Sequence, residues 1–211
     1  ANKGALMTVR ADDMTAQVIK ALIAKSGIDA NDIEDLILGC AFPEGEQGMN
    51  MARLIVSLGE LPISIAGVTL NRFCGSSMQA IHFAAGAIQM NAGEAFICAG
   101  VESMSRVPMG GFNYLPNPEL YQRYPQAYMS MGETAENLAQ KYNISRIDQE
   151  AFALLSQQKA YMAQQQGLLS DEIIPIVSQR GETIAQDGCL RPDSSAAGMA
   201  ELNPAFSVQG S

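Results

Sequence analysis

Hydrophobic patterns typical of helices and of strands alternate along residues 12–99, and this alternation limits the fold more than any other feature. The predicted segments are, in order, a helix over 12–25, a strand over 35–40, a helix over 49–58, a strand over 63–70, a helix over 78–90 and a strand over 95–99. Strands joined by single helices pair in parallel, because each helix returns the chain to the same end of the sheet. The sequence therefore predicts an α/β fold made of βαβ units, and we expect the 63–70 strand to be buried.

The composition and the hydrophobic pattern of the sequence change after residue 100. Residues 105–130 are rich in Pro, Gly, Asn, Met and Tyr and have no clear period, and so long an irregular segment in a compact domain usually has a function. Two helices over 131–142 and 147–166 follow, then a short extended piece over 172–177 and a loop with a helical turn near Met199. The second half therefore reads as a mainly helical insertion and not as a continued sheet.

Composition excludes several classes of function. The formal net charge is −9 without a Lys/Arg cluster, which argues against nucleic acid and anionic membrane surfaces as partners. No apolar run reaches the roughly 18 residues of a membrane-spanning helix. The four cysteines include no CxxC pair and the chain has one histidine, which argues against a zinc site. We expect no bound metal, reduced cysteines and a cytoplasmic location.

Cys74 occupies the predicted turn between the 63–70 strand and the helix that follows it. At that place the dipole and free N–H groups of the helix favour a thiolate, the form that attacks carbonyl groups, and the same N–H groups could hold an oxyanion. Gly75 would let a substrate approach the backbone closely. A buried cysteine that ends a strand is the alternative interpretation.

The single histidine, His82, cannot serve as the base for Cys74. It follows Cys74 by eight residues, which is about 12 Å along a helix. General-base catalysis needs a contact of about 3 Å or one bridging water. Either the helix dipole alone generates the thiolate, or the base lies outside these residues.

Six segments together resemble the thiolase family. NRFCGSSMQAI at 71–81 is similar to the family's nucleophile motif. The amino-acid sequences at 113–120 and 128–134 most resemble those of the degradative acetyl-CoA acyltransferases, the 3-ketoacyl-CoA thiolases. The other five segments follow in the family's order: AGVESMS (99–105), SMGETAENLA (130–139), SRIDQEAFALLSQQKA (145–160), DEIIPI (171–176) and LRPDSSAAGMAELNPAF (190–206).

The resemblance implies a covalent mechanism and a domain layout. The cysteine matched by Cys74 takes the acyl group of a 3-ketoacyl-CoA, acetyl-CoA leaves, and CoA then removes the acyl group. CoA is therefore a co-substrate, CoA thioesters are the ligands, and no cofactor is bound permanently. Residues 1–104 would be an α/β core without the family's first strand, 105–206 a CoA-binding loop domain, and 207–211 the start of the return to the core.

The resemblance also implies CoA contacts in the predicted loop domain. Arg191 matches an arginine near the adenine and phosphates, and the matches to the adenine and pantetheine walls are Met131, Gly132, Gly198, Met199, Leu202 and Phe206. Each has a simpler interpretation, as a solvated arginine, a helix start or core packing. Ser130 stands where some biosynthetic members have a substrate-contacting histidine, which weakens any expectation of strict acetoacetyl-CoA specificity.

The family's second half supplies N-E-A-F and G-H-P motifs and a C-x-G cysteine. The first two motifs do not occur in these residues, and the one C-x-G match, at 98–100, falls at the predicted 95–99 strand of the first half. We therefore expect an incomplete thiolase half that has no useful thiolysis activity alone and that belongs to a homodimer or homotetramer in the complete protein. A non-catalytic fragment that binds CoA or a partner is the alternative. A ketoacyl-synthase-type condensing enzyme fits the insertion less well, and an α/β-hydrolase lacks its G-x-S-x-G elbow.

Overall fold

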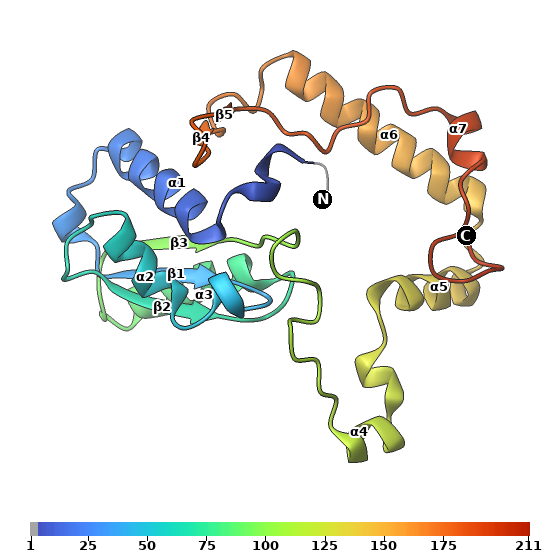
Figure 1. The fold of residues 1–211 in the computed structure, drawn as a ribbon, viewed down its shortest axis with the longest axis horizontal. Helices are drawn as coiled ribbons and strands as arrows, with labels where there is room; N and C mark the ends of the chain where they lie inside the picture. Colours follow the sequence, from blue (N-terminus) through green and yellow to red (C-terminus); the bar gives the residue numbers. More distant parts are fainter. Residues whose placement is uncertain (1–3) are drawn as a thin grey trace. The chain divides into compact units, whose positions relative to one another are not determined.

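The computed structural model describes residues 4–211 and has the predicted alternation in its first half (Figure 1). The elements of this half are α1 (Ala11–Ser26), β1 (Asp35–Gly39), α2 (Met51–Leu58), β2 (Ala66–Leu70), α3 (Ser76–Gln89) and β3 (Phe96–Gly100). Those of the second half are α4 (Pro118–Arg123), α5 (Met131–Tyr142), α6 (Arg146–Gln165), β4 (Ile176–Val177), β5 (Thr183–Ile184) and α7 (Ala196–Ala200). Single 3-10 turns lie at Ala5–Thr8, Ala30–Asp32, Gly45–Gln47 and Pro125–Tyr128.

The three long strands form one parallel sheet in the order β2-β1-β3. At the end of β1, Gly39 is paired with Leu70 of β2 and with Gly100 of β3. The chain segments that leave the three strands therefore meet at one edge of the sheet. The predicted α/β class is confirmed, and the position after β2 is the one where Cys74 lies.

Alternate side chains of β1 build a separate core on each face of the sheet. Leu36 and Leu38 pack with buried residues of α1 and α2, including Ile19 and Ile55. Ile37 packs on the other face with small residues of α3. The central strand is therefore buried on both sides, which explains its uninterrupted apolar sequence.

The expected burial of the 63–70 strand is wrong. The strand begins only at Ala66, because residues 63 and 64 form a turn after Pro62, and Ile63 is 87% exposed. None of the residues of β2 is buried, and Val68 is exposed. β2 is an edge strand among the described residues, so its apolar sequence alone did not decide its burial.

Contacts divide the chain into two compact units. Unit 1 comprises residues 1–114 and 174–186, and unit 2 comprises 115–173 and 187–211. Unit 1 thus includes the β4–β5 hairpin, which docks on α1 where the Gln17 side chain donates to the Val177 carbonyl at 3.1 Å and accepts from its N–H at 2.9 Å. The units therefore divide after residues 114, 173 and 186. The family resemblance led us to expect domain boundaries after residues 104 and 206.

Unit 2 consists of helices and loops in which no residue is buried. Its helices begin at well-formed caps. Ser130 and Glu133 form a reciprocal capping box at the start of α5, and the Ser145 side chain accepts from the N–H of Asp148 at the start of α6. Local capping and not a shared apolar core therefore defines these helices.

Candidate functional site

Cys74 lies in the turn that connects β2 to α3 and is exposed. Gly75 is the N-cap residue of α3, and the helix begins at Ser76. Cys74 therefore directly precedes the N-cap of α3; Ser76 is buried, and Cys74 is exposed. The alternative of a buried, strand-ending cysteine is wrong.

The backbone on either side of Cys74 is held by side chains of the same turn. Phe73 has φ of +45°, a left-handed conformation that is rare for an aromatic residue. The Asn71 side-chain oxygen accepts from the Phe73 N–H at 2.7 Å, and the Ser76 hydroxyl donates to the Phe73 carbonyl at 2.6 Å. The Ser76 hydroxyl also accepts from the Arg72 N–H at 2.9 Å. These bonds fix an otherwise unfavourable turn.

Two paired glycines lie under the first turn of α3. A Cβ at Gly39 would lie 2.6 Å from backbone atoms of Ser76 and Ser77, and a Cβ at Gly100 would overlap the Ser77 hydroxyl. The backbone at the start of α3 therefore approaches the sheet more closely than any side chain would allow. We infer that this close packing fixes the distance between the Cys74 turn and the ends of β1 and β3.

The four thiols differ in exposure and in acidity. Cys40 is buried and lies near Glu102, and burial followed by the carboxylate charge raises the pKa of its thiol to about 11. Burial also raises the pKa of Cys98. Cys74 and Cys189 are the exposed thiols. The chain's only histidine, His82, is on α3 and exposed.

A polar cluster that no sequence pattern predicted lies where β1 and β3 end, formed by the half-buried Glu102 and the buried Gln47. The Glu102 carboxylate accepts from the Ala41 N–H at 2.7 Å and from the Gln47 amide nitrogen at 2.6 Å. Gln47 is fully buried, and its side-chain oxygen accepts from the Ser103 N–H at 2.7 Å. Glu102 stands within the motif at 99–105, but Gln47 lies 55 residues away from it, so no local pattern could have joined the two.

Three of the residues predicted to contact CoA lie at the start of α5 and beside it. Met131 is the first residue of α5 and is 71% exposed. The Phe206 ring lies directly against Gly132, where a Cβ would overlap it. The structure thus brings Gly132 and Phe206 together, and the other face of the ring is open because Phe206 is exposed.

The remaining predicted CoA residues lie on and around α7. Gly198 and Met199 belong to α7, and Leu202 follows it. Arg146, which the sequence analysis did not single out, donates to the carbonyls of Met199 at 3.0 Å and Leu202 at 2.5 Å. Its ion pair with Glu150, at 2.6 Å and four residues along α6, could have marked it in the sequence.

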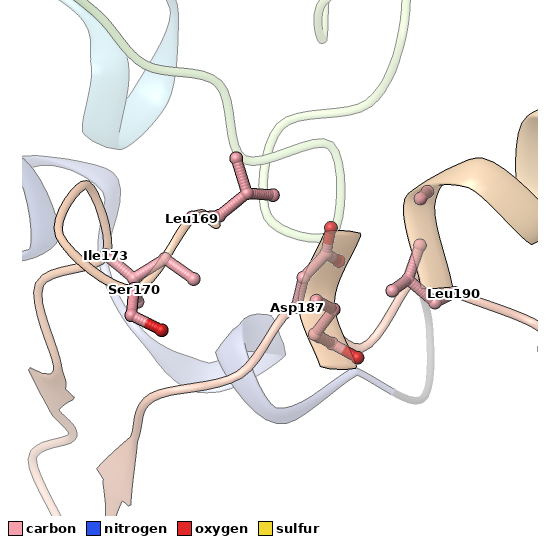
Figure 2. A pocket seen from close by; sticks show the side chains of 7 residues that line it. Leu169, Ser170, Ile173, Asp187 and Leu190 are labelled. Carbon is pink, nitrogen blue, oxygen red and sulfur yellow. The ribbon is translucent and has the colours of Figure 1, made fainter. Parts of the chain in front are cut away.

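Arg191 is exposed, and its backbone N–H donates to the side-chain oxygen of Gln157 on α6 at 2.9 Å. A cavity of about 80 Å³ lies beside this segment (Figure 2). Its lining is mainly apolar and comprises Ala160, Gln164, Leu169, Ser170, Ile173, Asp187 and Leu190. None of the predicted CoA residues lines it, so the cavity and the predicted CoA contacts are separate features of unit 2.

Across residues 4–211, no three His, Cys, Asp or Glu side chains are grouped as metal ligands would be. None of the helices described there combines the length and apolar character that crossing a membrane requires.

Comparison with known proteins identifies relatives of the whole chain. The chain is 45% identical over 222 residues to a 3-ketoacyl-CoA thiolase of Bacillus subtilis (strain 168), an alignment that covers 100% of this chain and 57% of the relative. It is 41% identical over 212 residues to 3-ketoacyl-CoA thiolases of Acinetobacter baylyi and Acinetobacter baumannii (strain AYE), with 98% of this chain and 54% of each relative covered. The chain thus spans about half the length of these curated relatives. The family model described as "Thiolase, N-terminal domain" matches residues 1–211, and the chain therefore belongs to the thiolase family.

Proposed function

We propose that the chain supplies the acylated cysteine and the CoA-binding residues of a thiolase-type acyltransferase. The reaction is CoA-dependent cleavage of a 3-ketoacyl-CoA to acetyl-CoA and a shortened acyl-CoA, or the reverse condensation. The observation that carries this proposal is an exposed Cys74 at the start of α3, in a chain that matches the thiolase N-terminal domain throughout.

Cys74 enters the reaction as a nucleophile. Its sulfur bonds to the keto carbon of the substrate, the bond between that carbon and the neighbouring CH₂ breaks, and the released acetyl-CoA carbanion takes a proton. The sulfur of a free CoA then attacks the acyl-cysteine, and the acyl group leaves on CoA while the cysteine sulfur is released. Backbone N–H groups at the start of α3 are suited to stabilise the negative oxygen of the tetrahedral intermediates.

Proton transfer needs groups beyond those that we assign here. His82 is on α3 and exposed, and we give it no catalytic role. We propose that the activating histidine and the proton-donating cysteine come from outside these 211 residues, so that the chain alone is acylated but turns over little or no 3-ketoacyl-CoA. Measurable thiolysis of acetoacetyl-CoA by the purified chain would contradict this part of the proposal.

We further propose that CoA binds along the exposed Phe206 ring and the start of α5, with Arg191 near its phosphates. Packing of Phe206 on Gly132 and the hydrogen bonds from Arg146 to the α7 region support a preformed wall in unit 2. This part of the proposal also fits a non-catalytic CoA-binding fragment. A cytoplasmic location and a homodimeric or homotetrameric complete protein belong to the same proposal.

Transfer of an acetyl group from acetyl-CoA tests the assignment of Cys74. The purified chain is incubated with acetyl-CoA, digested and examined by mass spectrometry. We expect the acetyl group on Cys74, its loss in Cys74→Ser, and its retention in Cys189→Ser, which removes the other exposed thiol. Equal acetylation of Cys189 would overturn the nucleophile assignment.

Calorimetric titration with CoA tests the second part. Replacing Phe206 by alanine is expected to weaken CoA binding about tenfold, which corresponds to about 1.4 kcal/mol. Val208, which is 98% exposed, provides the matched control in Val208→Ala. CoA binding without any acetylation of Cys74 would favour the non-catalytic alternative.

A further inference from the structure

We propose that Glu102 is a positioning residue for the Cys74 turn, acting through the backbone of Ala41 and the side chain of Asn71. The inference rests on the proposed role of Cys74 and adds a residue that sets its geometry. It joins the segments that follow all three parallel strands into one hydrogen-bonded path.

The first link of the path holds the segment after β1. Glu102 follows β3, and one of its carboxylate oxygens accepts from the Ala41 N–H at 2.7 Å. The other oxygen accepts from the buried Gln47 side chain at 2.6 Å, and the Gln47 nitrogen also donates to the Phe42 carbonyl at 2.9 Å. The Cys40–Ala41 peptide group is thereby held by a residue that follows β3.

The second link runs from the next peptide group, Ala41–Phe42, to the Cys74 turn. The Ala41 carbonyl accepts from the Asn71 side-chain nitrogen at 2.8 Å, and the Asn71 oxygen accepts from the Phe73 N–H at 2.7 Å. Phe73 precedes Cys74 directly, and its ring lies 6.1 Å from that of Phe42. A shift of the Ala41 backbone would therefore move the Asn71 side chain, one of the two groups that hold Phe73 in its left-handed conformation.

A carboxylate suits position 102 because both of its oxygens must accept hydrogen bonds. Glu102 has a backbone N–H on one oxygen and an amide N–H on the other. A glutamine of the same shape has one acceptor oxygen and would turn a donor toward a donor at the second contact. The Glu102→Gln variant therefore breaks one link while it keeps nearly the same volume.

The test measures how fast iodoacetamide alkylates Cys74 relative to Cys189 in the purified chain. We expect Glu102→Gln to lower this ratio at least about threefold, since small displacements of a reacting group cost large factors in rate. Glu44→Gln is the matched control, because the Glu44 carboxylate accepts from the Phe112 N–H at 2.6 Å and has no link to Asn71. This variant should keep the parental ratio.

A destabilised variant away from this path distinguishes positioning from general loss of stability. At Gly67 of β2 an added methyl carbon would lie 2.5 Å from the Arg53 backbone nitrogen, and we expect Gly67→Ala to destabilise unit 1 while keeping the parental alkylation ratio. If Glu102→Gln does not fold, Asn71→Ser decides instead, because this exposed position can lose its bond to the Ala41 carbonyl without disturbing the core.

An unchanged ratio in a folded Glu102→Gln chain would overturn the inference, as would an equal fall of the ratio in Gly67→Ala. An unchanged ratio in Asn71→Ser would also overturn it. Absence of acetylation in the parent chain would instead overturn the proposed function, and the alkylation ratios would still decide the positioning role.

Discussion

Replacing Gly39 by alanine tests whether close backbone packing sets the position of the Cys74 turn. Gly39 ends β1 in a backbone conformation that alanine can adopt, so the added methyl group is the main change. That methyl carbon would lie 2.6 Å from the Ser76 carbonyl carbon and from the Ser77 nitrogen. Both are backbone atoms of α3, and neither can rotate away.

The size of the effect follows from this overlap. Ordinary contact begins at 3.4 Å, so the strand and the helix must separate by about 0.8 Å. Overpacking of this kind costs about 1–3 kcal/mol, and a rigid helix start places the expected cost near 2 kcal/mol. With a urea dependence of about 2 kcal/mol per molar, the unfolding midpoint should fall by about 1 M.

Two other glycines serve as controls. Gly86 lies within α3, and a methyl group there would meet nothing within 4 Å, so Gly86→Ala should stabilise the chain by about 0.5–1 kcal/mol. At Gly67 of β2 a methyl carbon would lie 2.5 Å from the backbone nitrogen of Arg53 in α2. Gly67→Ala should therefore destabilise unit 1 about as much as Gly39→Ala, without moving Cys74.

Urea unfolding is best followed by hydrogen-exchange mass spectrometry of the β1 peptide, which reports on unit 1 alone. The relative alkylation rate of Cys74 is measured on the same variants. The reasoning is refuted if Gly39→Ala unfolds within about 0.2 M of the parent, or if Gly67→Ala changes the Cys74 rate as much as Gly39→Ala does.

Three further predictions concern other parts of the chain. Under limiting iodoacetamide Cys74 should react first, and Cys40 should react far more slowly, because its pKa of about 11 leaves about a hundredfold less thiolate than the ordinary value of 9.0; mass spectrometry measures both, and equal labelling would contradict this prediction. Burial raises the pKa of Asp35, and one of its carboxylate oxygens is buried without a partner. The neutral acid is therefore favoured in the folded chain, so this residue's contribution to stability is present at acid pH and is lost as pH rises from about 3.8 through the raised value. Asp35→Asn should consequently stabilise the chain at pH 7 by about 1 kcal/mol and not at pH 3, as urea midpoints at both pH values will reveal. Amides of α6 should exchange at least about a hundredfold faster than those of β1, because unit 2 has no buried residue, and equal protection in exchange experiments would refute this.

Most helices and strands could be predicted because they depend on local patterns. The period of apolar residues found α1, α2 and α3, and the unbroken run 35–40 found β1, which is buried on both faces. α4 escaped prediction because six residues are too few for a periodic signal, although Asn117 and Pro118 are a typical helix start. The burial of β2 depends on which elements cover it, and residues 63–70 do not carry that information.

The candidate site shows the same division. Cys74 could be proposed as a nucleophile because its neighbours form a local motif, and the structure places it exposed in the turn before α3. Gln47 and Glu102 could not be joined in advance, since their contact depends on β1 and β3 being neighbours in the sheet. Arg146 holds backbone carbonyls more than 50 residues away, and a backbone acceptor leaves no trace in residue type.

The paired glycines at the ends of β1 and β3 also bear on how distant relatives can be recognised. Gly39 and Gly100 leave space for the start of α3 because they have no side chain, and this does not depend on the residue at position 74. A related chain with another residue in place of this cysteine would still need both glycines to accommodate the start of the helix. Two strand-ending glycines some sixty residues apart, with a small residue at the helix start between them, are therefore a signature of this architecture that does not depend on catalysis.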